Sequence, residues 1–558
     1  MDNYQIADQF SLLSKLMDIH GENSFKSKSY SIAAYNIEQL SHPLEETPRT
    51  AIAGLRGIGD STSKKIVEIL DSGKLSALED LIRKTPTGVL QMLQIKGLGP
   101  KKIATVWKEM GIESIGELLY ACQENRLLLF KGFGEKTQQN VREAIEYFLR
   151  HQGQFLYAEM ETLARGFQQG LEQDFAEGKT AMTGAFARQS LTIDQLEWVT
   201  TVPLDSLQSW LAKKGMTDFV INGQTLSCVA EGLVTLRFHH TPAVFFGRTL
   251  FEKTGSTDFM EAWLEHGLTV PDADSEDAFF KLLGVQWMPP ALRETGLFIN
   301  AAKRLSVPEL IQAKDIKGIV HAHSTWSDGS NTLEEMAVAC IEQGFEYLVI
   351  SDHSRSAFYA RGLTEERVRE QQALIRELNL KLQPFRIFSS IECDILGDGS
   401  MDYPDEVLAS FDLVIASIHS NLKMSPEKAM QRLLGAIRNP YTTILGHPTG
   451  RLLLSREGYP IDHSAMIDAC IENKVAIEIN AHPRRLDLDW KWIPEALSKG
   501  AHLSIDPDAH AVEGYADIRY GVLAAQKGGL TKNHNLSSFT RSELENYLAS
   551  RSTRGNRR

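Results

Sequence analysis

Hydrophobic and polar residues follow different rhythms in different parts of the chain. Over residues 1–150 the apolar residues recur at helical spacing, as in IADQFSLLSKLMDIH, which predicts a string of helices. From about residue 316, short apolar runs such as YLVISDHS and LVIASIHS alternate with amphipathic helical stretches. That alternation is typical of a β/α fold with a parallel sheet or barrel. Residues 151–285 mix both kinds of stretch. The pattern therefore predicts a multidomain chain with an all-α, an α+β and an α/β region, in that order.

A short motif occurs three times in the helical region, at residues 55–70, 95–110 and 130–145. Each copy has an apolar residue, a basic residue, Gly-apolar-Gly and then a helix, as in IKGLGPKKIATVWKEM. Two glycines let backbone N–H groups approach an outside ligand, and the start of the helix can hold a phosphate without contacting a base. The alternative is a corner between helices whose glycines only permit close packing. The repetition favours phosphate binding, and the expected contacts are Gly57, Gly59, Gly97, Gly99, Lys101 and Lys102.

Histidines and carboxylates recur at the ends of the apparent strands in the third region. His321 and His323 project to the same side of a strand-like segment, so their imidazoles can converge on one metal. Further candidates follow in ISDHS, SSIECDI, ASIHS, LGHP and DPDAH. Because the carboxyl ends of barrel strands meet at one mouth, these side chains can gather there. A lone histidine would more often be a structural residue, but the recurrence predicts a metal centre.

Composition narrows the class of protein. Of 558 residues, 42% are hydrophobic and 23% charged, as in globular proteins, and no apolar run reaches the roughly 18–20 residues of a membrane span. The five cysteines form no CxxC motif, and the first residues lack an apolar signal segment. We therefore expect a cytoplasmic protein without disulfides or a membrane partner.

The formal charge of −13 argues at first against a nucleic-acid partner, since phosphates attract cations. However, residues 1–150 hold 19 basic and 19 acidic residues, so the helical region is neutral and the acidic surplus lies in the rest. The charge lowers the expected affinity for DNA without excluding DNA.

The three glycine motifs resemble the helix-hairpin-helix motif of DNA repair proteins, and residues 1–150 are similar to the lyase and fingers regions of the family X DNA polymerases. The resemblance implies DNA binding without sequence preference. It also places Lys65 at the position of the lysine that forms a Schiff base in the lyase reaction, with Tyr30 and Lys26 near the pocket. The alternative for Lys65 is a phosphate contact or a solvated position.

The resemblance continues to about residue 285, but the residues that catalyse polymerisation in the family are not retained. In the motif of the family that binds the triphosphate, Ala185 and Ala187 replace a serine and an arginine. Of the three carboxylates that hold two Mg²⁺ ions, Asp194 matches the first, while Leu196 and Thr235 stand at the others. We therefore expect a palm of the nucleotidyltransferase type that no longer polymerises.

Residues 316–535 resemble the PHP (polymerase and histidinol phosphatase) domain, which implies a distorted (β/α)7 barrel with up to three divalent metals. Glu392 is expected to bridge two metals and, with Asp508, to serve catalysis, and Arg451 and Arg484 are expected phosphate contacts unless they are solvated or ion-paired. Imidazole and carboxylate ligands together suit Mn²⁺, Zn²⁺ or Fe²⁺ better than Mg²⁺. The ligands that the resemblance implies are His321, His323, Asp328, His353, Glu392, His419, His447, Asp508 and His510.

The whole order resembles bacterial family X DNA polymerases with an appended PHP domain. The leading hypothesis is a monomeric DNA-repair enzyme that hydrolyses phosphodiester bonds at 3′ ends of gapped or nicked DNA, as a 3′→5′ exonuclease. The alternatives are a working polymerase that uses another carboxylate such as Glu197, and a DNA-binding adaptor with structural metals. The expected domains are 1–75 (lyase-like), 76–150 (fingers-like), 151–285 (palm and thumb-like), 286–315 (linker), 316–535 (PHP) and 536–558 (helix and basic tail).

Overall fold

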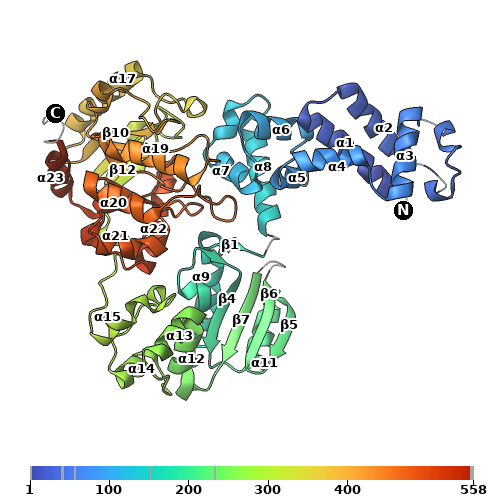
Figure 1. Cartoon of the computed structure of the whole chain (residues 1–558). Helices are drawn as coiled ribbons and strands as arrows, with labels where there is room; N and C mark the ends of the chain where they lie inside the picture. The colour runs from blue at the N-terminus through green and yellow to red at the C-terminus, as the bar shows by residue number, and fades with distance from the viewer. Residues whose placement is uncertain are drawn as a thin grey trace. The chain divides into compact units, whose positions relative to one another are not determined.

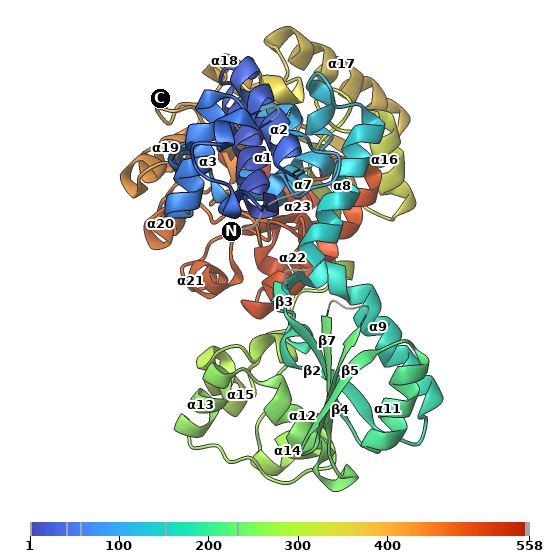
Figure 2. The same ribbon diagram turned by 90° about the vertical axis from the view of Figure 1, so that its right-hand side faces the viewer.

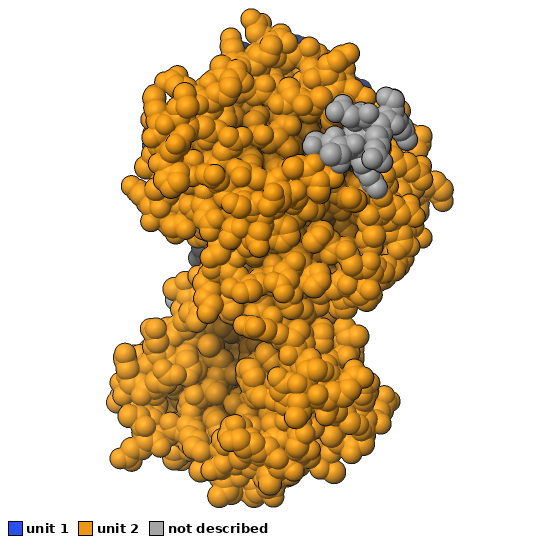
Figure 3. Space-filling model, turned by 90° about the vertical axis from the view of Figure 1, so that its left-hand side faces the viewer, with its two compact units in different colours: residues 1–148 blue, residues 149–558 orange. Residues whose placement is uncertain are grey.

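The computed structural model describes residues 3–38, 40, 43–55, 58–150, 153–230 and 234–552. The chain divides into two compact units, residues 1–148 and residues 149–558 (Figure 3). In the described part of the chain, no helix is both long and apolar enough to cross a membrane.

The first unit is built from helices joined by short turns (Figure 1). They are α1 (Asn3–His20), α2 (Ser24–Glu38), α3 (Asp60–Ser72), α4 (Ser76–Lys84), α5 (Thr87–Met92), α6 (Pro100–Ala104), α7 (Ile115–Gln123) and α8 (Glu135–Arg150). Apolar side chains join α1 to α2, where the rings of Phe10 and Tyr30 lie 5.9 Å apart. The start of α7 is fixed by a capping box, in which Ser114 accepts the N–H of Glu117 and the Glu117 side chain accepts the N–H of Ser114. The helical prediction for this region is confirmed.

The second unit begins with a mixed sheet of order β2-β4-β7-β6-β5, in which β4 and β7 run parallel. Its strands are β2 (Thr180–Thr183), β4 (Gln195–Thr200), β5 (Thr217–Asn222), β6 (Thr225–Ala230) and β7 (Val234–His240). Helices α9 (Tyr157–Asp174) and α11 (Leu204–Lys213) cover one face, and α12 (Phe246–Thr254) lies against the other (Figure 2). Leu196 and Trp198 alternate inward on β4 and pack with Phe238 beneath α9 and α11.

Residues 286–315, expected as a linker, pack against the middle domain. Met288, Leu292 and Ile299 join a buried apolar cluster with α12, α13 (Thr257–Glu265) and α14 (Glu276–Leu283). The Pro-Pro pair at 289–290 starts a 3₁₀ turn, and α15 (Ile299–Lys303) follows. This segment therefore contributes to a hydrophobic core.

A parallel sheet of seven strands, in the order β14-β13-β12-β11-β10-β9-β8, forms the last part of the described chain. The strands are β8 (Gly318–Ala322), β9 (Tyr347–Ile350), β10 (Arg386–Asp394), β11 (Leu413–Ser417), β12 (Thr442–Leu445), β13 (Ala476–Asn480) and β14 (Leu503–Asp506). Residues after β14 nearly close the barrel, because the Ala509 N–H donates to the His321 carbonyl and the His323 N–H donates to the Ala509 carbonyl. This is the expected (β/α)7 architecture.

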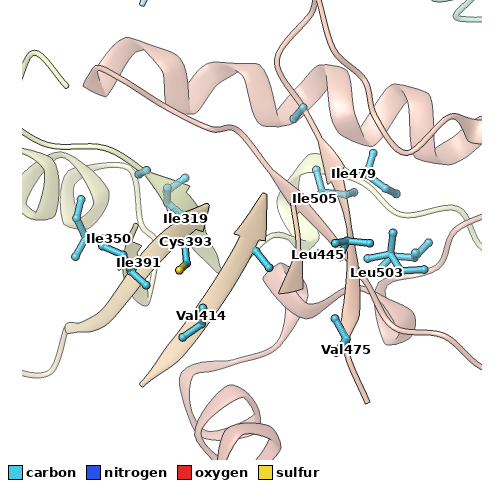
Figure 4. Close-up of a cluster of buried hydrophobic side chains, with 14 of the residues drawn as sticks. Ile319, Ile350, Ile391, Cys393, Val414, Leu445, Val475, Ile479, Leu503 and Ile505 are labelled. Atoms are coloured by element: carbon cyan, nitrogen blue, oxygen red, sulfur yellow. The ribbon is translucent and has the colours of Figure 1, made fainter. Parts of the chain in front are cut away.

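The barrel strands are buried on both sides, so their sequences are nearly continuous apolar runs. Ile319, Ile350, Ile391, Val414 and other branched side chains from successive strands pack together (Figure 4). The surrounding helices are α16 (Leu333–Glu342), α17 (Glu365–Lys381), α18 (Asp405–Leu408), α19 (Pro426–Arg438), α20 (His463–Asn473), α21 (Ile493–Ser498) and α22 (Ile518–Lys527), and α23 (Arg541–Ser552) follows. Because the strands are parallel, their carboxyl ends share one mouth.

Candidate functional site

Glu392, at the carboxyl end of β10, lies at the centre of the barrel mouth and is 1% exposed. Five histidines surround its carboxylate. His353 Nδ1 and His447 Nε2 lie 2.9 Å from a carboxylate oxygen, and His419 Nε2 lies at 3.0 Å. His321 Nε2 and His323 Nε2 lie at 3.3 and 3.6 Å. The residue expected to bridge two metals thus contacts ligands from both halves of the barrel.

Asp508 and Asp328 complete the arrangement. Asp508 Oδ1 lies 3.1 Å from His323 Nε2 and 3.5 Å from His321 Nε2. Asp328 lies 3.5 Å from His353 Nε2 and 3.6 Å from His510 Nε2. All nine predicted ligands are therefore gathered at one mouth, although they come from the carboxyl ends of six strands and the loops that follow them.

The spacing of the donor atoms fits divalent metals. In the described part of the chain, three overlapping groups each offer three or four ligand atoms within 4.8 Å of one another. Buried atoms such as His321 Nε2, Asp328 Oδ2 and Glu392 Oε2 accept or donate no hydrogen bond among the described residues. Buried polar atoms of this kind are rare without a partner, and a cation would satisfy them. The groups are His323–Asp328–His353–His510, His321–His323–Asp508 and His353–Glu392–His419.

Three of the gathered residues have left-handed backbones. The φ angles of His321, His447 and Asp508 are 62°, 22° and 53°. Such conformations are costly for residues other than glycine and are concentrated at functional sites. The surrounding chain holds them, for example through the hydrogen bonds that Ala509 makes on both sides of the closing seam.

A second layer of carboxylates orients the histidines. The Glu478 carboxylate accepts from His321 Nδ1 and also accepts the backbone N–H of His447 at 2.5 Å. Asp394 lies 3.0 Å from His419 Nδ1. In each case the second nitrogen of the same imidazole points to Glu392, which is the usual arrangement around a metal-binding histidine.

Glu478 and Asp394 are not among the residues predicted from the sequence, although the sequence holds a signal for both. Glu478 interrupts the apolar strand AIEIN, and a buried glutamate needs a partner. Asp394 follows Glu392 by two residues on β10, so both point to the same face. Asp352 accepts hydrogen bonds from Ser324, Ser327 and Gln371 and so shapes the loop that carries Asp328.

Opposite charges in contact set the protonation of this cluster. Burial alone opposes ionisation of Glu392, but His419 and His321 lower its pKa well below the usual range. Burial alone would lower the pKa of His321, but Glu478 and Asp508 raise it well above the usual range. Burial and the nearby Arg485 lower the pKa of His447 to about 3. Glu392 is therefore ionised and His447 neutral at pH 7, the forms that bind metal.

The arginines near the mouth differ in their contacts. Arg451 pairs with Asp489 and donates to the carbonyls of Arg485 and Leu486, so it holds a loop. Arg484 pairs with Glu159 of the middle domain at 3.1 Å. Arg485, by contrast, has its Nε 3.7 Å from Asp508 Oδ2, so it is the arginine that faces the metal ligands.

In the first unit, the glycine motifs form tight turns before helices. Gly97 and Gly132 have φ angles of +87° and +96°, which favour glycine. Gly59 and Gly99 precede α3 and α6 as N-caps with negative φ, and a Cβ at either would meet no atom within 4 Å. Gly57 lies outside the described residues. Close packing therefore does not explain Gly59 or Gly99.

The lysines of these motifs lie near the turns. Lys102 approaches the Gly97 carbonyl, with Nζ 3.4 Å from the oxygen, and Lys101 is exposed beside it on α6. Lys65 lies half-buried on α3, with Nζ 5.9 Å from the centre of the Tyr30 ring. Lys65 and Tyr30 are thus neighbours, as the resemblance implies, while Lys26 is exposed on α2.

In the middle domain, the residues at the positions of the polymerase motifs do not form a group of carboxylates. Leu196 points into the apolar core, and Asp194 is exposed before β4. Glu197, on the opposite face from Leu196, lies 3.3 Å from His239 Nε2. It also lies directly beneath Gly184, where a Cβ would come within 2.0 Å of its carboxylate.

Known proteins are similar to this chain over its whole length and over separate regions. Residues 1–75 match the family described as a helix-hairpin-helix domain, and residues 89–146 match the SAM-like helix-hairpin-helix tandem. The DNA polymerase/3'-5' exonuclease PolX of Bacillus subtilis is 34% identical over 554 residues, which cover 95% of this chain and 96% of that protein. A probable phosphatase of Caldicellulosiruptor bescii is 31% identical over 170 residues (29% of this chain, 63% of that protein). Another, of a Thermoanaerobacter species, is 24% identical over 240 residues (41% and 92%).

Proposed function

Because the chain belongs to the family X DNA polymerases of the PolX type, we propose that it processes DNA, and that its barrel hydrolyses phosphodiester bonds at 3′ ends with divalent metals. The convergence of Glu392 and the eight other predicted ligands at one mouth carries this proposal. The preferred substrate in the proposal is gapped or nicked DNA, and the metals are Mn²⁺, Zn²⁺ or Fe²⁺.

The chain's own residues prepare the site for phosphoester hydrolysis. When bound, the metals would supply a nucleophilic hydroxide at neutral pH and neutralise phosphate oxygens. Glu392, Asp508 and Asp328 supply negative charge to hold them, while Glu478 and Asp394 fix the orientation of two imidazoles. Arg485 lies close enough to Asp508 for its guanidinium to attract the negative phosphate of a substrate. The near-complete burial of these groups strengthens each electrostatic interaction.

The first unit is proposed to hold DNA through its glycine turns. Neither backbone strain nor packing requires glycine at 59 or 99, since both have ordinary φ angles and open space beside them. A ligand that approaches the backbone from outside would require it, and the starts of helices attract phosphate. Such contacts involve no base and suit a unit without a net positive charge. Lys65 is also proposed as a candidate for lyase chemistry, because it lies next to Tyr30 as the resemblance implies.

The middle domain is proposed to have lost polymerisation. Glu197, the carboxylate that the alternative hypothesis needs, lies beside His239 and under Gly184. Arg188, the arginine left in the triphosphate motif, lies 3.2 Å from Glu294 and donates to the Thr254 carbonyl. In the described part of the chain, no cluster of potential metal ligands lies in this domain. Two Mg²⁺ ions need more carboxylates than these residues supply.

One experiment tests both proposals. A gapped duplex with a 5′-labelled primer is incubated with the full chain and Mn²⁺, with and without deoxynucleoside triphosphates. We expect the primer to shorten in both mixtures, and we expect Glu392→Gln to reduce shortening by at least about a hundredfold because the shared ligand is lost. The matched control is Glu377→Gln, which removes an exposed carboxylate from α17.

The outcomes separate the alternatives. Primers that lengthen with triphosphates would show that the middle domain polymerises. Tight DNA binding with no shortening at any metal concentration would instead indicate an adaptor with structural metals. Equal shortening by wild type and the Glu392→Gln variant would place the hydrolytic site elsewhere.

A further inference from the structure

Phe358 is an aromatic side chain left in solvent beside the metal centre. It lies in the 3₁₀ turn Phe358–Ala360, in the loop that connects β9 to α17 at the mouth of the barrel. Its side chain is 82% exposed, and it is the only exposed large aromatic side chain among the described residues of the barrel. Burying such a ring against a ligand would be favourable.

A short series of rings connects Phe358 to the predicted metal ligands. The Phe358 ring packs edge-to-face on Tyr359, with centres 5.9 Å apart, and the Tyr359 ring lies 6.4 Å from the imidazole of His353. His353 in turn contacts Glu392. The two aromatic residues therefore extend from the predicted metal ligands to the surface.

The loop is held in place on both sides of the turn. Asp402 accepts hydrogen bonds from the backbone N–H and hydroxyl of Ser356. On the other side, Arg367 of α17 donates to the Arg361 carbonyl. Gly362 packs so tightly on the Ser354 carbonyl that a Cβ there would lie 1.9 Å from the oxygen. Phe358 is thus exposed on a loop whose backbone is held on both sides of the turn, which lowers the cost of ordering the ring against a ligand.

We propose that Phe358 and Tyr359 form a stacking platform for the base of the 3′-terminal nucleotide, a role that rests on the proposed function of the barrel. Aromatic rings stack on any base, which suits an enzyme that does not select sequence. Arg361, an exposed cation at the end of the turn, would attract the phosphates of the same strand, whereas Arg355 before the turn pairs with Glu365 and Asp402. The position of the ring next to the predicted metal ligands favours a nucleic-acid strand over a protein as the ligand.

The test compares two single-stranded oligonucleotides that differ only at the 3′ end. One ends in thymidine and the other in a tetrahydrofuran residue, which has no base. Phe358→Ala is expected to lower kcat/KM about tenfold on the thymidine end, within the range for one stacked base, and to leave the baseless end unchanged. Phe358→Trp is expected to retain activity on both. The matched control is Leu380→Ala, which removes another exposed apolar side chain, from α17.

A binding measurement separates this inference from the proposed function. An oligonucleotide with 2-aminopurine at its 3′ end is titrated with the Glu392→Gln variant, with and without Phe358→Ala, because stacking quenches the fluorescence of this base. Quenching that depends on Phe358 supports the platform, whether or not the wild type cleaves the oligonucleotides. Failure of the wild type to cleave either oligonucleotide would refute the hydrolytic role of the barrel but not the platform. Equal loss of activity on both ends, or quenching independent of Phe358, would overturn the platform.

Discussion

At the scale of single residues, the barrel mouth concentrates charge where the solvent cannot reach it. Glu392 and Glu478 are both almost fully buried, and each ionised carboxylate would be costly without partners. Histidines are the main partners of both, with His321 lying between the two carboxylates. The pair therefore determines where the Nε2 atom of His321 points, which is toward the centre of the site.

Glu478→Gln tests this orientation. The amide keeps the shape of the side chain but removes the charge that holds the proton on His321 Nδ1. We expect metal affinity to fall by about 10- to 100-fold while the fold is retained, since partners of this kind have effects of that size. Competition for Mn²⁺ or Zn²⁺ with a coloured chelator measures the affinity. With Glu377→Gln as control, unchanged affinity in Glu478→Gln would mean that the carboxylate only fills space.

At the scale of elements, the turn before α6 shows two separate uses of glycine. The first glycine of this motif, Gly97, adopts a positive φ and so serves the turn itself. The second, as in Gly99, has an ordinary φ of −80° and open space around it. The first position is needed for folding, whereas the second is free to serve an outside ligand.

The two positions should therefore respond differently to alanine. Gly97→Ala is expected to lower the free energy of unfolding by about 1–2 kcal/mol, because alanine is strained at positive φ. Gly99→Ala should change stability by less than about 0.5 kcal/mol, since the smaller freedom of the unfolded chain offsets the weaker N-cap. In the same variant, DNA affinity should fall severalfold. Thermal unfolding and fluorescence anisotropy with a labelled duplex measure the two effects, and unchanged affinity for DNA in Gly99→Ala would contradict the proposed phosphate contact.

Most of the barrel's elements could be predicted from local patterns, because strands buried on both sides leave continuous apolar runs such as YLVI and LVIAS. The gathering of Glu392 with histidines from other strands followed from the rule that strand ends share a mouth. What the sequence could not supply were pairings between distant segments. Arg484 looks like a phosphate contact in the sequence, yet it pairs with Glu159, 325 residues away. Trp287 and the prolines after it resemble a linker, yet Met288 beside them is buried.

At the scale of the whole second unit, ion pairs and hydrogen bonds join the middle domain to the barrel. Lys527 at the end of α22 has its Nζ 2.7 Å from Glu294 and donates to the Arg188 carbonyl. Arg519 pairs with Glu161 on α9. Arg188 thus lies at the interface between the middle domain and the barrel, and the middle domain contributes to the packing of the barrel.

Lys527, at the interface between the middle domain and the barrel, makes the free energy of unfolding depend on pH. Burial lowers its pKa to about 8 from the ordinary value of 10.5, despite the attraction of Glu294. Between these pH values the unfolded chain still binds a proton that the folded chain has released, so the free energy of unfolding rises with pH through this window.

Lys527→Met cannot titrate and should show a smaller rise between pH 8 and 10. Urea unfolding followed by the tryptophan fluorescence of the full chain measures the difference. The exposed Lys381→Met serves as control and should retain the rise. Parallel pH profiles for wild type and Lys527→Met would mean that the lysine is charged in both states and that the joint is more hydrated than its contacts indicate.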